Sequence, residues 1–168
     1  PIRCTQNPTM MEEGRNLWHP EVIPGRGADD SVLIIGGGPA GLEAAMSLGR
    51  RGYRVTLAEA DAVMGGRVTR EAALPGLSAW GRVRDYRLGQ LAKLRSVSLY
   101  PSSRMEVDDI LGFGADRVVI ATGARWRRDL VGRGGRIGMA RISKVVTPDD
   151  IMSGLVLAGR ILVHDAEG

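Results

Sequence analysis

Cysteine, aromatic residues and long apolar runs are scarce in this chain. Its 168 residues include one cysteine, one phenylalanine, three tryptophans and three tyrosines. A single cysteine forms no internal disulfide, which fits a reducing compartment, so we expect a cytoplasmic protein. A helix needs ~20 consecutive apolar residues to cross a bilayer. No run of that length occurs, and we expect no membrane partner.

A dense basic cluster is also missing. The 23 basic residues outnumber the 19 acidic ones and give a net charge of +4, but nearly all are arginines spread along the chain. No block of about five or six like charges and no dedicated basic helix is present. The charge therefore indicates a solvated surface, and we expect no nucleic-acid partner.

Residue types for catalysis or metal binding are equally few. His19 and His164 are the two histidines, and together with Cys4 they are too few for a complete metal site. No serine, histidine and acid form a recognisable motif for nucleophilic catalysis. We therefore expect no catalytic residue in this chain.

Glycine, by contrast, is abundant. The 24 glycines are about twice the usual share of 7% and predict tight turns and close backbone approaches. Residues 31–35 form an apolar run typical of a strand buried on both faces of a parallel sheet. Residues 39–51 have apolar residues at helical spacing, and 53–58 are apolar and β-branched. This order predicts a strand, helix and strand unit with a right-handed crossover.

The remaining segments predict an α/β domain with a mainly parallel sheet in three layers, a Rossmann-like FAD/NAD(P)-binding fold. The expected elements are a loop over 61–75, a helix near 83–94, a strand over 96–100, a helical turn over 107–111, a strand over 116–121, a connection over 125–147 and a short helix from Pro148. We expect three regions: an irregular arm over 1–30, the nucleotide-binding domain over 31–147, and the start of a second subdomain over 148–168.

A glycine-rich turn follows the first predicted strand. Gly36, Gly38 and Gly41 have the G-x-G-x-x-G spacing, in which the first glycine turns the chain, the second admits a pyrophosphate and the third lets the helix approach the sheet. The helix that begins near Pro39 directs its unpaired amides, including that of Ala40, toward the phosphate. The motif alone is weak, since a glycine-rich turn without a ligand has the same spacing.

An acid at the end of the second predicted strand strengthens the motif. Glu59 follows the last glycine by roughly 20 residues, the spacing at which an acid accepts hydrogen bonds from ribose hydroxyls. A carboxylate there disfavours a 2′-phosphate, so the pattern favours FAD, NAD or ADP over NADP. The alternative is a solvated acid at a strand end.

Two further glycine-containing segments follow in the order seen in adenine-nucleotide flavoproteins. Gly65, Gly66 and Arg67 place backbone amides and a cation shortly after Glu59. Ala121, Thr122 and Gly123 end a predicted strand with residues small enough for a cofactor to pass close by. Each segment alone is also compatible with a simple turn.

Longer strings of sequence carry a more specific resemblance, which covers nearly the whole chain. The chain resembles the two-dinucleotide-domain flavoproteins, and in particular the C-terminal region of the trimethylamine dehydrogenase family, which includes dimethylamine and histamine dehydrogenases. The matching strings are Cys4-Thr5-Gln6-Asn7-Pro8, Trp18-His19-Pro20, Ala73-Leu74-Pro75-Gly76-Leu77, Arg84-Asp85-Tyr86-Arg87, Gly123-Ala124-Arg125-Trp126 and Thr147-Pro148-Asp149-Asp150.

The resemblance implies a larger parent enzyme of which this chain is a fragment. In that family an N-terminal barrel carries FMN, a 4Fe-4S cluster follows, and a pair of nucleotide-binding domains completes the protein. The family oxidises an amine at the FMN and passes electrons through the cluster to an electron-transfer flavoprotein. We therefore expect the barrel to be a partner missing from this chain, and the chain alone to bind without turnover.

The resemblance also assigns a metal ligand and a nucleotide. Cys4 stands where the family has the fourth cysteine of its cluster, with the other three expected before Pro1; the alternative is a plain cysteine. The amine dehydrogenases hold ADP in this domain, whereas the more distant 2,4-dienoyl-CoA reductase branch holds FAD. Both nucleotides stay open, and so does a reductase that takes electrons from NAD(P)H.

The sequence thus predicts an adenine-nucleotide site for ADP or FAD. The candidate binding residues are Gly36, Gly38, Pro39, Ala40, Gly41, Glu59, Ala60, Gly65, Gly66, Arg67, Ala121, Thr122 and Gly123, and the candidate cluster ligand is Cys4.

Overall fold

The computed structural model describes residues 4, 7, 9–11, 23–25, 29–129, 131–132, 135–136, 145–155 and 157–163. The chain divides into two units, Pro1–Gly123 and Ala124–Gly168, which are described separately. Most of the predicted arm, including His19, and the second histidine, His164, lie outside the described residues. Among the helices in the described ranges, none has the length and apolar character needed to span a membrane.

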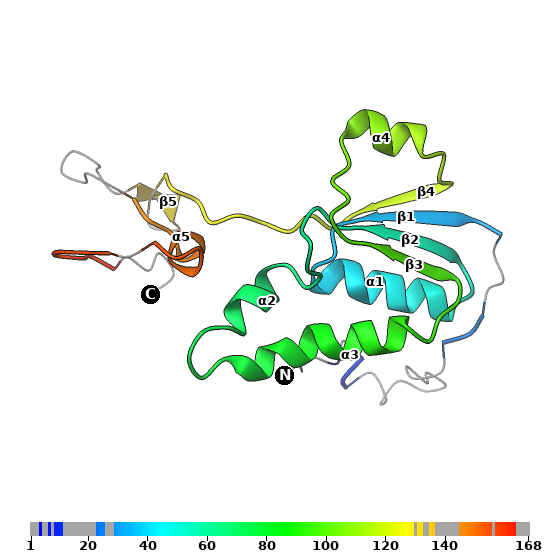
Figure 1. The fold of residues 1–168 in the computed structure, drawn as a ribbon, viewed down its shortest axis with the longest axis horizontal. Coiled ribbons are helices and arrows are strands. Elements are labelled where there is room, and N and C mark those ends of the chain that lie inside the picture. The colour runs from blue at the N-terminus through cyan, green and yellow to red at the C-terminus, as the bar shows by residue number, and fades with distance from the viewer. Residues whose placement is uncertain are drawn as a thin grey trace. The chain divides into compact units, whose positions relative to one another are not determined.

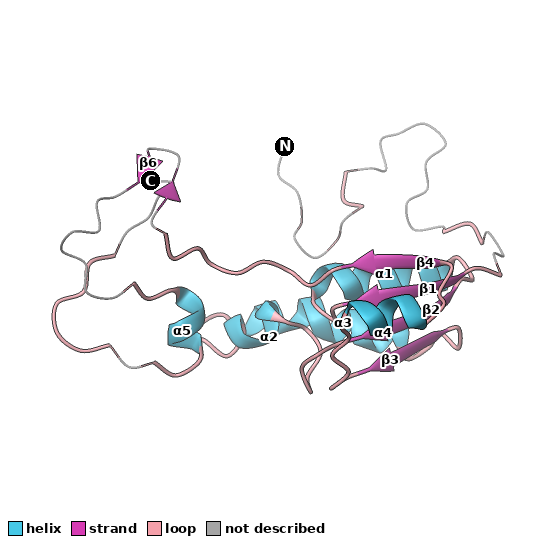
Figure 2. Cartoon of the chain, turned by 90° about the horizontal axis from the view of Figure 1, so that it is seen from above, coloured by secondary structure: helices cyan, strands magenta, loops and turns pink. Residues whose placement is uncertain are grey.

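A parallel four-stranded sheet forms the centre of the first unit, as predicted. The strand order is β3-β2-β1-β4, and each neighbouring pair runs parallel. The arrowheads of the strands therefore point to the same side (Figure 2). The strands are β1 (Ser31–Ile35), β2 (Arg54–Ala58), β3 (Val97–Tyr100) and β4 (Arg117–Ile120).

Two helices, α1 (Pro39–Arg50) and α3 (Gly81–Leu91), cover one face of the sheet (Figure 1). Alternate residues of the strands point to this face because the side-chain period of a strand is two. The core here combines Val32, Ile34, Val55 and Leu57 of the strands with Leu42, Ala45, Met46, Met64 and Leu91. A buried ion pair joins the two helices, since Arg87 Nε donates to Glu43 Oε2 at 2.8 Å.

The opposite face is covered by α4 (Val107–Gly112), which completes three layers (Figure 1). Leu33, Ile35 and Ala58 point to this side and pack against Met105, Ile110 and Ala115. Glu106 begins α4 with a capping box, in which its side chain and that of Asp109 each accept a backbone N–H. The predicted α/β fold class is confirmed.

Residues 61–75, predicted as a loop, contain a short helix. Helix α2 (Arg67–Glu71) has five residues and follows two glycines with positive φ angles, +114° at Gly65 and +54° at Gly66. A helix this short has no amphipathic period to read, and tertiary packing rather than propensity holds such a helix. A 3₁₀ turn, Ser78–Trp80, then leads into α3.

The second unit contains a two-residue hairpin and a short helix. Strands β5 (Val131–Gly132) and β6 (Gly135–Arg136) pair antiparallel within the segment predicted as a connection. Helix α5 (Pro148–Met152) begins as predicted, with a capping box between Thr147 and Asp150. Residues 160–163, expected to begin another strand, form none.

Arg128 ties this unit together through Asp150. Arg128 donates to Asp150 Oδ1 and to the carbonyl of Val145. This guanidinium and the donors of Thr147 lower the pKa of Asp150 from 3.8 to about 2. A hollow of about 480 Å³ lies beside the pair, and none of the predicted binding residues lines it. The lining residues are Arg128, Val146, Asp150, Ser153, Gly154 and Leu155.

Candidate nucleotide-binding site

The predicted binding segments meet at the carboxyl edge of the sheet. Gly36 follows β1, Glu59 follows β2 and Ala121 follows β4, and these strands are neighbours running in the same direction. The Gly36 amide donates to Ala58 O at 2.8 Å, and the Ala121 amide donates to Ile35 O at 2.8 Å. In open α/β sheets this edge, beside a change of strand order, is where ligands bind.

Gly36 and Gly41 have no room for side chains. Gly36 has a φ of +108°, and a Cβ there would overlap the carbonyl of Ala121. A Cβ on Gly41 would overlap Gly36 O, because α1 crosses directly over the end of β1. The first and third glycines of the motif therefore fit the expected roles of a sharp turn and a close helix approach.

Gly38 is different, because nothing in the chain requires glycine there. Its φ is −72°, and a Cβ would meet nothing within 4 Å. Gly38 is the N-cap of the 12-residue helix α1, it supplies no capping side chain, and Pro39 has no amide hydrogen. The amides of Ala40 and Gly41 lie in the first turn, where no helical acceptor exists. An open, side-chain-free approach to a helix N-terminus fits a diphosphate.

Glu59 is buried against the glycine-rich turn. Its side chain is 9% exposed, Oε2 accepts the Gly37 amide at 2.6 Å, and Oε1 accepts the Asp61 amide at 2.9 Å. A carboxylate has about four lone-pair sites, so each oxygen keeps capacity for a ribose hydroxyl. Glu59 therefore holds the turn in place as well as standing where the sequence predicts a ribose acceptor.

The Gly65-Gly66 turn lies directly against the glycine-rich turn. The Gly65 amide donates to Gly37 O at 2.8 Å. A Cβ built on Gly66 would lie 3.3 Å from the Cα of Gly38. Arg67 follows as the first residue of α2. The structure thus brings together two segments that the sequence analysis linked only by their order.

The remaining predicted residues border this cluster less closely. Ala60, Thr122 and Gly123 are exposed, and a Cβ on Gly36 would lie 3.1 Å from the Thr122 amide nitrogen. Gly123 has a φ of +78° and open space around it. Cys4 is exposed, and among the described residues no group of three or more His, Cys, Asp or Glu side chains forms a metal site. The cluster-ligand role of Cys4 stays a prediction.

Sequence reasoning missed four residues at this edge. Gly37 supplies an amide to Glu59 and a carbonyl to Gly65, and Met64, 7% exposed, fills the space beside it. Thr69 and Arg84 support the Gly65 turn from behind. The glycine between the two motif glycines was a visible signal for Gly37. No local signal points to the contact between Thr69 and Arg84, because it depends on how α2 and α3 pack.

This arrangement defines a dinucleotide-binding domain, and comparison with known proteins identifies its family. Residues 30–144 match the pyridine nucleotide-disulphide oxidoreductase family. The chain belongs to this family.

More specific relatives are amine-oxidising enzymes. Dimethylamine dehydrogenase of Hyphomicrobium sp. (strain x) is 41% identical over 99% of this chain. The structure of histamine dehydrogenase from Rhizobium sp. 4-9 is 54% identical over 90% of this chain, with a TM-score of 0.82. The 6-hydroxypseudooxynicotine amine oxidase of Pseudomonas geniculata N1 is 52% identical over 91%, with a TM-score of 0.83. The resemblance to the trimethylamine dehydrogenase family is confirmed.

The chain spans about a quarter of the length of these relatives. The matched region is 24% of dimethylamine dehydrogenase, 22% of histamine dehydrogenase and 23% of the amine oxidase.

Proposed function

We propose that this chain binds an adenine nucleotide, ADP or the ADP half of FAD, at the carboxyl edge of its sheet. The observation that carries the proposal is Gly38, which has free space where a side chain would stand, at the uncapped N-terminus of α1. Because the chain supplies no atom for that space, the glycine is explained by a ligand that approaches the backbone closely.

Each part of the site has one task in this proposal. The turn from Gly36 to Gly41, with Pro39 and Ala40, receives the diphosphate at the positive end of the α1 dipole. Glu59 accepts ribose hydroxyls through the lone pairs that the Gly37 and Asp61 amides leave free. The other predicted residues border the nucleotide: Ala60, Gly65, Gly66, Arg67, Ala121, Thr122 and Gly123.

The parent protein in this proposal is an amine dehydrogenase that carries FMN and a 4Fe-4S cluster. Its support is the similarity to dimethylamine and histamine dehydrogenases, together with Cys4 at the place of the family's fourth cluster cysteine. The missing barrel would carry out amine oxidation, and an electron-transfer flavoprotein would accept the electrons. The chain alone binds the nucleotide without turnover, and a cytoplasmic location stays a prediction from the single cysteine.

The test begins with the purified 168-residue chain. Denaturation releases bound nucleotide, which absorbance and mass identify, and the emptied protein is then titrated with ADP and with FAD. ADP, released or bound more tightly, supports the amine-dehydrogenase reading. FAD released from yellow protein favours a parent resembling 2,4-dienoyl-CoA reductase. Folded protein that binds neither nucleotide contradicts the proposed function.

A further inference from the structure

Arg84 lies behind the Gly65-Gly66 turn, on the side away from the glycine-rich loop. A Cβ built on Gly65 would lie 2.6 Å from Cδ and 3.0 Å from Cγ of Arg84. The methylene stem of Arg84 therefore occupies the space that a side chain at position 65 would need. With 25% of its side chain exposed, Arg84 is largely enclosed by these neighbours.

The guanidinium of Arg84 continues this support into α2. Arg84 NH1 donates to Thr69 Oγ1 at 3.2 Å, and Thr69 Oγ1 donates to Met64 O at 3.0 Å. Arg84 Nε donates to Asp85 Oδ1 at 2.7 Å, which fixes the plane of the guanidinium. A chain of hydrogen bonds thus runs from α3 through α2 to the residue that precedes Gly65.

The turn transmits this position to the nucleotide site. The Gly65 amide donates to Gly37 O at 2.8 Å, and the Gly37 amide donates to Glu59 Oε2 at 2.6 Å. Gly65 has a φ of +114°, a conformation that fixed neighbours must maintain. A shift of the turn would therefore move both the glycine-rich loop and the carboxylate.

We propose that Arg84 is the positioning residue of the site: its stem and guanidinium hold the Gly65-Gly66 turn, and through Gly37 they set the loop that receives the nucleotide diphosphate. The inference rests on the proposed function for its ligand. Its structural half, the control of the turn by Arg84, does not depend on a bound nucleotide.

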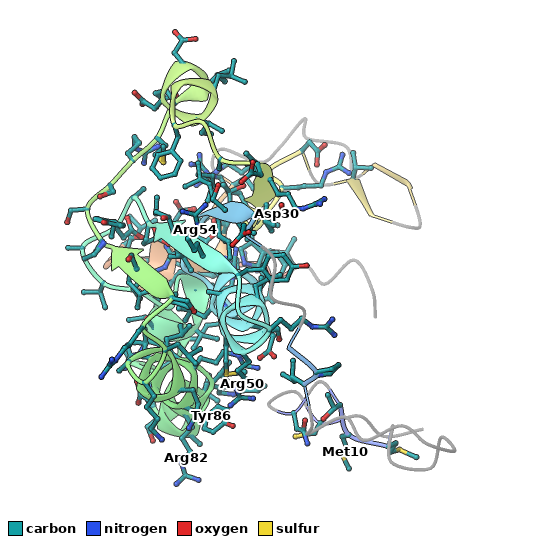
Figure 3. The ribbon with its side chains drawn as sticks, turned by 90° about the vertical axis from the view of Figure 1, so that its right-hand side faces the viewer. Met10, Asp30, Arg50, Arg54, Arg82 and Tyr86 are labelled. Atoms are coloured by element: carbon teal, nitrogen blue, oxygen red, sulfur yellow. The ribbon has the colours of Figure 1, made fainter. Side chains whose placement is uncertain are left out.

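The matched variants are Arg84→Met, Thr69→Val and Arg82→Met. Arg84→Met keeps an unbranched stem and removes the guanidinium, while Thr69→Val removes the bridging hydroxyl. Arg82→Met makes the same chemical change on the same helix at an exposed side chain, which points away from the domain (Figure 3). Arg84→Lys is the milder variant if Arg84→Met does not fold.

The first readout is amide hydrogen exchange in the nucleotide-free chain. We expect the Gly65 amide to exchange about tenfold faster in Arg84→Met and Thr69→Val, on the scale of one hydrogen bond to a charged group. Amides of β1 and β2 and the Arg82→Met variant should be unchanged. Unaltered exchange at Gly65 in the Arg84 variant would overturn the proposal.

The second readout is ADP affinity by calorimetry. We expect Arg84→Met to weaken ADP binding by about tenfold, and the double variant with Thr69→Val to bind no more weakly than Arg84→Met alone, because both act on one chain of hydrogen bonds. A lower melting temperature with unchanged affinity would overturn the positioning role. If the unmodified chain binds no nucleotide, the proposed function fails while the exchange measurement still decides the structural half.

Discussion

The two edges of the sheet are built in opposite ways. At the carboxyl edge, main chain meets main chain: Gly36 abuts Ala121, Gly41 abuts Gly36, and the Gly65 amide bonds to Gly37 O. Little space separates these segments, so there the sequence is constrained by volume and backbone angle.

At the amino edge, exposed side chains make the links. Ser31 donates from its amide and its hydroxyl to Asp116 Oδ2, each at 2.7 Å, and Arg117 pairs with Asp30 at 2.9 Å. Arg54 donates to the carbonyl of Asp29 at 2.7 Å. Exposed pairs of this kind contribute little to stability. The comparison teaches that the carboxyl edge is specialised for close approach, whereas the amino edge only fastens strands.

Gly41→Val should break the carboxyl edge most severely. The new side chain overlaps Gly36 O, and we expect a loss of about 3 kcal/mol or more in the free energy of unfolding. Chemical denaturation measures the loss. The matched control is Gly89→Val in α3, where a Cβ meets nothing within 4 Å and stability should be nearly unchanged. Equal stability of the two variants would contradict the close packing of α1.

Glu59→Gln should have the next largest effect. Both carboxylate oxygens accept amide hydrogens, and the NH₂ of glutamine would face one of these donors, Gly37 or Asp61. A buried donor left unsatisfied costs about 1–3 kcal/mol. Denaturation should report this loss, and the Gly37 amide should exchange faster. A variant with native stability and native Gly37 exchange would show that the carboxylate does not hold the turn.

Gly38→Ala separates binding from stability. Because a Cβ there meets no protein atom, we expect the free energy of unfolding to change by about 1 kcal/mol or less, the scale of an N-cap substitution. ADP affinity should fall by about tenfold or more, since the methyl group stands where the diphosphate approaches. Calorimetry on both proteins checks the pair of values. Native affinity in this variant would remove the main support for the nucleotide site.

Asp116→Asn tests the amino edge and should have the smallest effect. The hydrogen bonds from Ser31 lower the pKa of Asp116 below its ordinary value of 3.8. A lowered folded-state pKa gives stability that is present above that ordinary value and is lost as pH falls through the folded value. Melting temperatures measured from pH 7 to pH 2 should fall slightly less steeply for the variant below about pH 4. Identical slopes would show that this carboxylate is not coupled to folding.

Local patterns predicted much of the fold. The strand at 31–35, the helix from Pro39 and the strand at 53–58 follow from apolar periodicity, and the glycine spacing predicted the crossing of α1 over β1. These features depend on residues close together in sequence, where sterics and hydrogen bonding act directly.

The site's internal supports were beyond such patterns. Helix α2, the bond from Gly37 to Glu59 and the contact between Arg84 and Thr69 arise only when segments distant in sequence pack together. The sequence correctly gathered the glycines and Glu59 into one list of candidates. It gave no reason for Arg84 or Met64, since their roles depend on α3 packing beside the Gly65 turn.

The most direct test of the central claim is a backbone-amide NMR titration of the chain with ADP. The account predicts that signals of Gly36, Gly37, Ala40, Gly41, Glu59, Gly65, Gly66 and Gly123 shift in a saturable way. Signals of the amino edge, Ser31 and Asp116, should stay in place. Absence of saturable shifts in folded protein, or shifts confined to the amino edge, would contradict a nucleotide site at the carboxyl edge.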